Sequence, residues 1–239
     1  MSHAKNVETY SRLVEFCTGY GGNYNPGQQN LKLNAMRAML EKAQSSLQDV
    51  SLKRLDYKRV TNEREIAFAD LSKLTSRIVL YLSTSGVPDQ TVDDARFYAR
   101  LIGGSVRKRE PIPSGEADEK PLTTRSLTQR SYVALKDHFT QLVELIKKEP
   151  AYQPNEEDLQ LASLEAKVDE LKTVTANVNK AKAEWSNALI YRNRLMYKGR
   201  ESLVNHGATV KRYVRSVFGN TSAQSVQMAE LSFTKRKVK

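Results

Sequence analysis

The chain has 239 residues, of which 39% are hydrophobic and 27% charged, an ordinary composition for a folded protein of one or two domains. Its 38 Lys and Arg exceed its 27 Asp and Glu, and the resulting net charge of +11 makes an anionic partner worth considering. No run approaches the roughly 18 apolar residues of a membrane-spanning helix. The first ten residues have neither a secretion-signal nor a transit-peptide pattern, so we expect a cytoplasmic protein.

The first predicted element is a short helix over residues 5–18, which ends at a glycine-rich turn starting at Gly19. This turn lacks the Gly-Lys-Ser/Thr of a phosphate-binding loop, and it follows a helix rather than a strand, so we interpret it as a helix stop. Cys17 is the only cysteine and can form no internal disulfide. Because it lies beside Phe16 in an apolar stretch, we expect a small buried side chain rather than a reactive thiol.

A long helical stretch is predicted between Gln28 and Ser85, where there is no glycine or proline. A heptad seam typical of a coiled coil runs through it, formed by Met36, Leu40, Ala43, Leu47 and Val50 and then by Phe68, Leu71, Ile78 and Leu82. In between, the seam holds Arg54, Tyr57, Thr61 and Arg64. Polar seam residues indicate a helix break, a solvent-filled waist or a partner that supplies acidic groups, and the run Thr61-Asn62-Glu63 favours a break near residue 62.

A turn over 86–89 precedes a short predicted helix that begins at Asp89 and stops at Gly103. Residues 105–126 contain three prolines, many charges and few large apolar side chains, which is typical of a linker. Helix is expected again from residue 127 towards Pro150.

The stretch from Pro154 to Gly219 is predicted to be one long helix or two helices end to end. Its apolar stripe, with steps of three and four residues, consists of Leu164, Val168, Leu171, Val174, Val178, Ala181, Trp185 and Ala188. No proline interrupts this stretch between Pro154 and Gly219. Gly199 and Gly207 are the expected bends or breaks, since glycine costs roughly 1 kcal/mol relative to alanine inside a helix.

The two halves of the sequence resemble each other. Leu31, Leu33, Met36 and Ala38 match Leu159, Leu161, Leu164 and Ala166 at a constant offset of 128, and Tyr24-Asn25-Pro26 matches Tyr152-Gln153-Pro154 just before them. Ordered agreement of several blocks indicates an internal duplication.

These observations predict an all-α fold, an elongated bundle of long antiparallel helices built from that duplication. The predicted divisions are a first helical repeat over 1–104, the linker over 105–126, a second repeat over 127–219, and a short helix with a basic tail over 220–239.

Positive charge gathers near the end of the second half. Seven cations, against Glu201 as the one acid, form the candidate anion-contact or nucleic-acid-contact set: Arg192, Arg194, Lys198, Arg200, Lys211, Arg212 and Arg215. Tyr191, Tyr197 and Tyr213 lie among them, a mixture that could contact phosphates and stack on bases. The alternative is a solvated basic face with its tyrosines in the core.

The sequence has no arrangement typical of a catalytic centre. His3, His138 and His206 are far apart and have no neighbour at metal-ligand spacing, and carboxylate pairs such as Glu156 and Glu157 fall at predicted helix starts. We therefore expect no enzyme activity, cofactor, metal site or small-molecule substrate.

The interpretation that the sequence favours is a non-enzymatic structural or interaction protein, a self-associating helical-bundle scaffold that forms a homo-oligomer and has a basic surface. One alternative is a nucleic-acid-binding protein that contacts phosphates through residues 192–215. A second alternative is peripheral binding to an anionic membrane.

Overall fold

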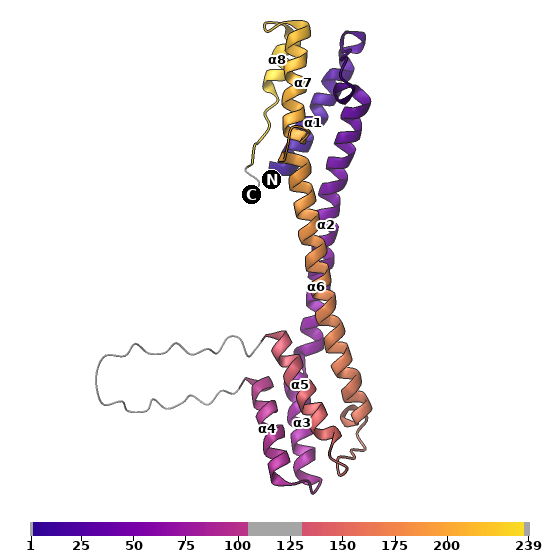
Figure 1. Ribbon diagram of the computed structural model, residues 1–239, viewed down its shortest axis with the longest axis vertical. Helices are drawn as coiled ribbons and strands as arrows, with labels where there is room; N and C mark the ends of the chain where they lie inside the picture. Colours follow the sequence, from indigo (N-terminus) through magenta and orange to yellow (C-terminus); the bar gives the residue numbers. More distant parts are fainter. Residues whose placement is uncertain (1, 105–130, 237–239) are drawn as a thin grey trace, which may run out of the picture. The chain divides into compact units, whose positions relative to one another are not determined.

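The computed structural model describes residues 2–104 and 131–236 (Figure 1). Within these ranges the regular secondary structure is entirely helical, which confirms the predicted all-α class. The α-helices are α1 (Ser2–Gly19), α2 (Leu33–Ala69), α3 (Leu71–Thr84), α4 (Asp89–Gly103), α5 (Tyr132–Lys147), α6 (Leu161–Tyr197), α7 (Leu203–Phe218) and α8 (Ala223–Glu230). The predicted linker over 105–126 and the helix start expected at residue 127 lie outside the described residues.

The chain divides into two compact units. Unit 1 comprises Met1–Tyr57 and Ala181–Lys239, and unit 2 comprises Lys58–Lys180. The long helices α2 and α6 each contribute residues to both units. Each of the two predicted repeats therefore supplies part of each unit.

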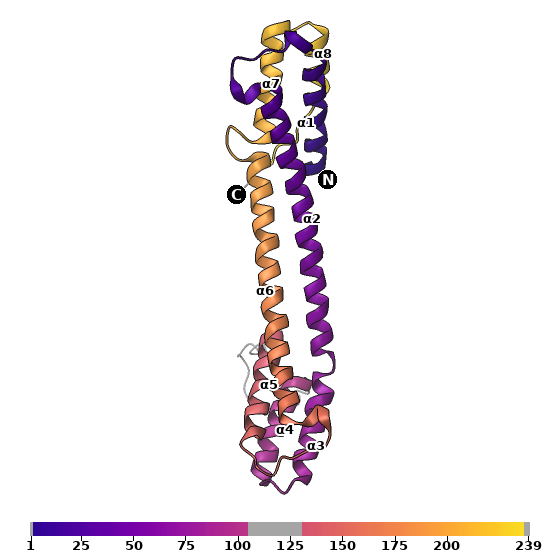
Figure 2. The ribbon, with the colours of Figure 1, turned by 90° about the vertical axis from the view of Figure 1, so that its right-hand side faces the viewer.

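Unit 1 has a core built from α1, the first part of α2, the last part of α6, and helices α7 and α8. Helix α7 lies beside α1 and α8 in both ribbon views (Figures 1 and 2). Tyr10, Leu13, Met36 and Met196 are fully buried in this core. Cys17 is fully buried as well, which confirms the expectation of a buried small side chain.

Unit 2 packs α3, α4 and α5 against the remaining parts of α2 and α6 (Figure 1). Ile78 and Leu82 from α3 belong to the same core cluster as Phe139 from α5 and Leu171 from α6, and all four side chains are removed from solvent. Tyr81 and Tyr152 add an edge-to-face ring contact with centroids 5.3 Å apart. The apolar stripe predicted for the second half is thus a core-forming face in this unit.

Helix α2 is continuous through the polar seam, so the break expected near residue 62 is wrong. The helix ends only at Ala69, and Asp70 separates it from α3. Two of the four seam residues have aromatic partners: the Tyr57 ring stacks on Trp185 in unit 1, and the Arg64 guanidinium lies 4.0 Å from the centre of the Tyr132 ring in unit 2. A cation over an aromatic face is stabilised without an acidic partner.

The break expected at Gly199 is confirmed, whereas Gly207 neither breaks nor ends a helix. Helix α6 ends at Tyr197, and Gly199 has a φ of +85°, in the left-handed region that glycine enters without a Cβ penalty. Gly207 lies buried inside α7. Glycine at this position is therefore explained by packing and not by the backbone conformation.

The two long helices are entered through matching turns. Short 3₁₀ turns at Gln29–Leu31 and Glu157–Leu159 precede α2 and α6, and each of these helices has 37 residues. The Tyr24 hydroxyl donates to the Leu31 carbonyl at 2.7 Å, and the Tyr152 hydroxyl donates to the Leu159 carbonyl at 2.9 Å. A tyrosine seven residues upstream thus closes the turn before each long helix.

A buried hydrogen-bonded chain joins α1, α7 and the turn before α2 in unit 1. The His206 Nε2 atom lies 2.8 Å from the Asn30 carbonyl, which can only accept, so this nitrogen carries the proton. The Nδ1 atom then accepts from the Tyr10 hydroxyl at 2.8 Å. Burial lowers the pKa of His206 and raises the pKa of Tyr10. The His206 imidazole and the Tyr10 hydroxyl are therefore both neutral in this hydrogen-bonded chain.

Replacing Leu171 by alanine is expected to lower the free energy of unfolding by roughly 2–5 kcal/mol, because it opens a cavity in the core of unit 2. Leu80→Ala is the matched control, since Leu80 belongs to the same unit and is 67% exposed. Chemical denaturation followed by circular dichroism measures both changes. Equal, small losses would show that the buried face of α6 is misplaced.

Acidification is expected to destabilise the fold through His206. Its pKa is lowered in the folded state, so the stabilisation is fully present above the unfolded value of about 6.5 and is lost as pH falls below it, where the unfolded chain binds the proton first. His206→Gln keeps a donor and an acceptor without titrating. Denaturation at pH 7.5 and pH 5 should show a smaller loss in this variant, and an equal loss would contradict the assignment. The variant still contains His3, whose pKa is lowered to about 4, mainly by burial, and which acts in the same direction.

Candidate anion-binding groove

The basic residues of α7 lie at the edge of its buried stripe or on the side facing away from it. Leu203, Val210 and Val214 point into the core, so Arg212 and Arg215 are left exposed while Lys211 is half-buried. Apolar residues at steps of three and four fix this orientation, because they bury one side of the helix. The apolar spacing that anchors α7 therefore also determines where its cations lie.

A groove of about 960 Å³ runs along this basic face in unit 1. One wall comes from the start and outer side of α7, and the other comes from the end of α8 and the segment that follows it. The cations that line it are Arg200, Lys211, Arg212, Arg215 and Lys235. None of the described side chains that line the groove is acidic. A concave surface of one sign concentrates the field and attracts ions of the opposite sign.

Two cations of the groove, Lys211 and Arg212, are oriented by neutral partners. The Lys211 Nζ atom donates to the Leu231 carbonyl at 2.7 Å, and the Arg212 Nη2 atom donates to the Thr209 hydroxyl at 3.1 Å. Burial lowers the pKa of Lys211, and the neighbouring Arg215 lowers it further. Within residues 2–104 and 131–236, none of the five groove cations is in an ion pair. An anion in the groove would relieve their mutual repulsion.

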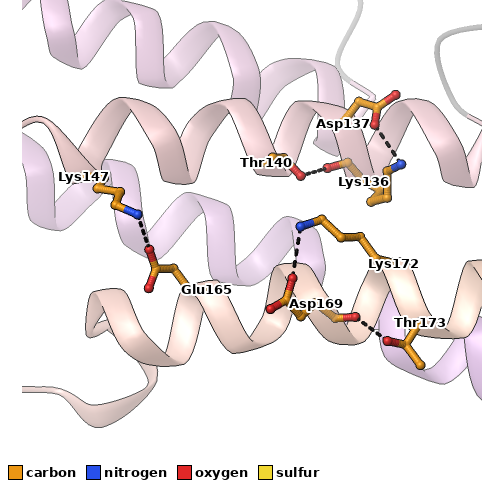
Figure 3. Close-up of polar contacts among 8 residues, drawn as sticks. All are labelled: Lys136, Asp137, Thr140, Lys147, Glu165, Asp169, Lys172 and Thr173. Carbon is orange, nitrogen blue, oxygen red and sulfur yellow. Dashed lines mark hydrogen bonds and ion pairs between the residues drawn. The ribbon is translucent and has the colours of Figure 1, made fainter.

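In unit 2, by contrast, several cations form ion pairs with carboxylates. On α5 and α6, Lys147 pairs with Glu165 at 2.7 Å, Lys172 pairs with Asp169 at 3.0 Å, and Lys136 lies 3.0 Å from Asp137 (Figure 3). Arg77 of α3 forms a two-pronged pair with Asp158. These cations are already neutralised by carboxylates of their own unit.

The two units also differ in their numbers of charged residues. Unit 1 contains 19 Lys and Arg against 8 Asp and Glu, whereas unit 2 contains 19 of each. The whole net charge of the chain therefore resides in unit 1. An anionic partner would be attracted to that unit and not to the other.

The structure brings together four of the seven cations predicted from the sequence. Arg200, Lys211, Arg212 and Arg215 share the groove, whereas Arg194 and Lys198 are exposed outside its lining.

Arg192 also lies outside the groove. It is half-buried, donates to the Asn193 side chain at 2.8 Å, and has a pKa lowered mainly by burial.

Sequence reasoning missed Lys235 as a groove residue. It belongs to the basic tail, and the tail pattern alone does not say where the chain turns back. Only the docking of the segment after α8 against α7 places this ammonium group among the groove cations.

The three tyrosines of the basic stretch do not line the groove. Tyr213 packs edge-on against Tyr24, with ring centroids 5.5 Å apart, and the Tyr197 hydroxyl lies 2.9 Å from His3 Nδ1. Tyr191 is 53% exposed. The groove thus has the charge of a phosphate-binding surface without the predicted platform for stacked bases.

Other chemistry is sparse in the part of the chain that the structure describes. Burial raises the pKa of Cys17 to about 12, so this thiol is not poised as a thiolate nucleophile. Residues 2–104 and 131–236 hold no cluster of three His, Cys, Asp or Glu side chains suited to a metal ion. Among the described helices, none combines the length and apolar character needed to cross a membrane.

Comparisons of the chain with protein-family models, with curated proteins and with solved structures found no match in any of the three.

Proposed function

We propose that this chain is a non-enzymatic interaction protein whose unit 1 binds nucleic acid through its phosphates. The observation that carries the proposal is the groove between α7 and the segment after α8, where five cations without carboxylate partners among the described residues line one continuous concavity. Arginine and lysine are the side chains that contact phosphate oxygens, and they supply most of the sequence-independent affinity for nucleic acid.

The groove favours recognition of the backbone rather than of the bases. Sequence-tolerant binding of single strands normally combines a basic groove with aromatic stacking platforms. Among the described residues that line the groove, Phe233 is the one aromatic side chain, and the tyrosines of the basic stretch lie outside this lining. Binding should therefore depend steeply on salt and little on base sequence.

Charge reversal inside the groove tests this proposal. Arg212→Glu with Arg215→Glu is expected to abolish binding of a fluorescein-labelled oligonucleotide, measured by fluorescence anisotropy, because two phosphate contacts become repulsive. Arg194→Glu with Lys198→Glu is the control, since it makes the same change in net charge at exposed positions outside the groove. It should weaken binding far less.

Replacing a single groove cation by alanine should also lower the slope of log affinity against log salt concentration by about one. Equal losses in the two double variants would mean that net charge, and not the groove, governs binding. Salt-independent binding, or none by the wild-type protein, would contradict the proposal. Binding to acidic vesicles but not to the oligonucleotide would favour the membrane alternative.

The internal duplication supports a second role as a scaffold. The equal lengths of α2 and α6, their identical entry turns and the matched Tyr24 and Tyr152 hydrogen bonds all follow the offset of 128 found in the sequence. We infer that two copies of one helical segment became joined in this chain. The further expectation of an elongated antiparallel bundle stays a prediction.

Self-association of this scaffold has one specific support in unit 1. Leu52 and Leu55 lie one turn apart on α2 and are 56% and 64% exposed. Large apolar side chains grouped on a helix surface are typical of contact sites.

Light scattering on a sizing column at low and high salt should give a defined multiple of 27.0 kDa that survives salt. Leu52→Lys with Leu55→Lys should return it to the monomer mass. A wild-type monomer at both salt concentrations would contradict the scaffold proposal and leave nucleic-acid binding unaffected.

A further inference from the structure

The segment 231–236, which follows α8 and has no regular secondary structure, is fixed at several points of unit 1. Leu231 is 1% exposed in the core, and its carbonyl accepts from Lys211. Thr234 is held by its backbone to Asn6 of α1. The segment is therefore docked against both α1 and α7 rather than trailing from α8.

Asn6 bonds to both backbone groups of one residue of this segment, Thr234, as a residue on a neighbouring strand would. Its Oδ1 atom accepts from the Thr234 amide at 2.8 Å, and its Nδ2 atom donates to the Thr234 carbonyl at 2.9 Å. The side chain is completely buried. If the segment undocked, this amide would lose two partners, which is costly for a buried polar group.

Gly207 provides the space for the same segment. A Cβ atom at this position would lie 2.6 Å from Cζ and 2.7 Å from Cε2 of the Phe233 ring, closer than such atoms approach in proteins. The glycine has no left-handed backbone to justify it and weakens the middle of α7 by roughly 1 kcal/mol relative to alanine. The close approach of Phe233 accounts for it.

The docked segment is also a wall of the groove. Leu231, Ser232 and Phe233 line it, together with the cation of Lys235. Docking brings this ammonium group to a surface that already holds Lys211 and Arg215. Repulsion between these like charges opposes the docked state. An anion bound among them offsets that repulsion and favours the docked state.

We propose that the segment 231–236 completes the anion-binding groove, and that Asn6 and Gly207 are positioning residues that hold it there. The inference rests on the proposed binding of phosphates in this groove. Segment docking and ligand binding are then coupled: an undocked segment loses the wall and Lys235, and a bound ligand suppresses undocking to the same extent.

Gly207→Ala tests the coupling without altering any cation. Two measurements are made on the full chain: hydrogen exchange of residues 231–236, and anisotropy of a fluorescein-labelled oligonucleotide. The variant should exchange faster in the segment and bind about tenfold more weakly or worse, the scale expected when a phosphate contact and part of the site are lost. Added oligonucleotide should slow exchange of the segment in the wild-type protein.

Gly207→Ala combined with Phe233→Ala is the matched rescue. It removes the ring that the new methyl group would strike and keeps the Asn6 and Lys211 hydrogen bonds, so exchange and affinity should return to those of Phe233→Ala alone. Asn6→Leu provides an independent variant of similar size, and it should reproduce the weaker binding if Gly207→Ala fails to fold by circular dichroism.

Each other result overturns the proposal. Faster exchange with unchanged affinity would show that the segment is not part of the site, and faster exchange with tighter binding would show that it blocks the site. Weaker binding with a docked segment would mean that Gly207 acts by another route. Failure of the wild-type protein to bind any oligonucleotide would remove the proposed function itself, and the charge-reversal pair identifies that case separately.

Discussion

The hydrogen-bonded chain from Tyr10 through His206 to the Asn30 carbonyl is the constraint on which unit 1 depends. It ties α1, α7 and the turn before α2 together at a point removed from water, where each polar atom must find a partner. Because it fixes the rotation of α7 together with the apolar stripe of that helix, it also decides which side chains face outward. The row of cations along the groove is a consequence of how the opposite side of α7 is anchored.

Both units are helical, but they differ in net charge. Unit 2 balances its 19 basic residues with 19 acidic ones and pairs many of them, as Lys147 with Glu165 and Arg77 with Asp158. Unit 1 leaves an excess of cations and places five of them around one hollow. Two helical units of one chain thus differ in charge: unit 2 is neutral and pairs its cations, whereas unit 1 is suited to meeting an anion.

Much of the fold was predictable because it depends on local patterns. Helix periodicity gave the all-α class, and the break at Gly199 followed from the low helix propensity of glycine. The expected break near residue 62 was wrong because Arg64 finds its partner in the Tyr132 ring, about seventy positions further along the chain. No local rule can supply such a partner.

The candidate site shows the same limit. Four of its cations were predictable from their density on one helix, but Lys235 joins them only through the course of the chain after α8. The sequence indicated Gly207 as a possible bend, whereas in the structure this glycine leaves room for the Phe233 ring. A glycine in a helix is visible in a sequence, but the ring that rests on it is not.

The meeting of Asn6 with Thr234 has a consequence for how the chain folds during synthesis. Unit 2 is one continuous stretch, so it can fold as soon as it has emerged. Unit 1 must wait, because α1 leaves the ribosome first and its partners α7 and α8 come last. At ordinary translation rates the delay is on the order of ten seconds. During that time the apolar face of α1, with Tyr10, Leu13 and Val14, lacks the part of its core that α6, α7 and α8 supply, and the nascent protein exposes to chaperones a surface that the finished molecule buries.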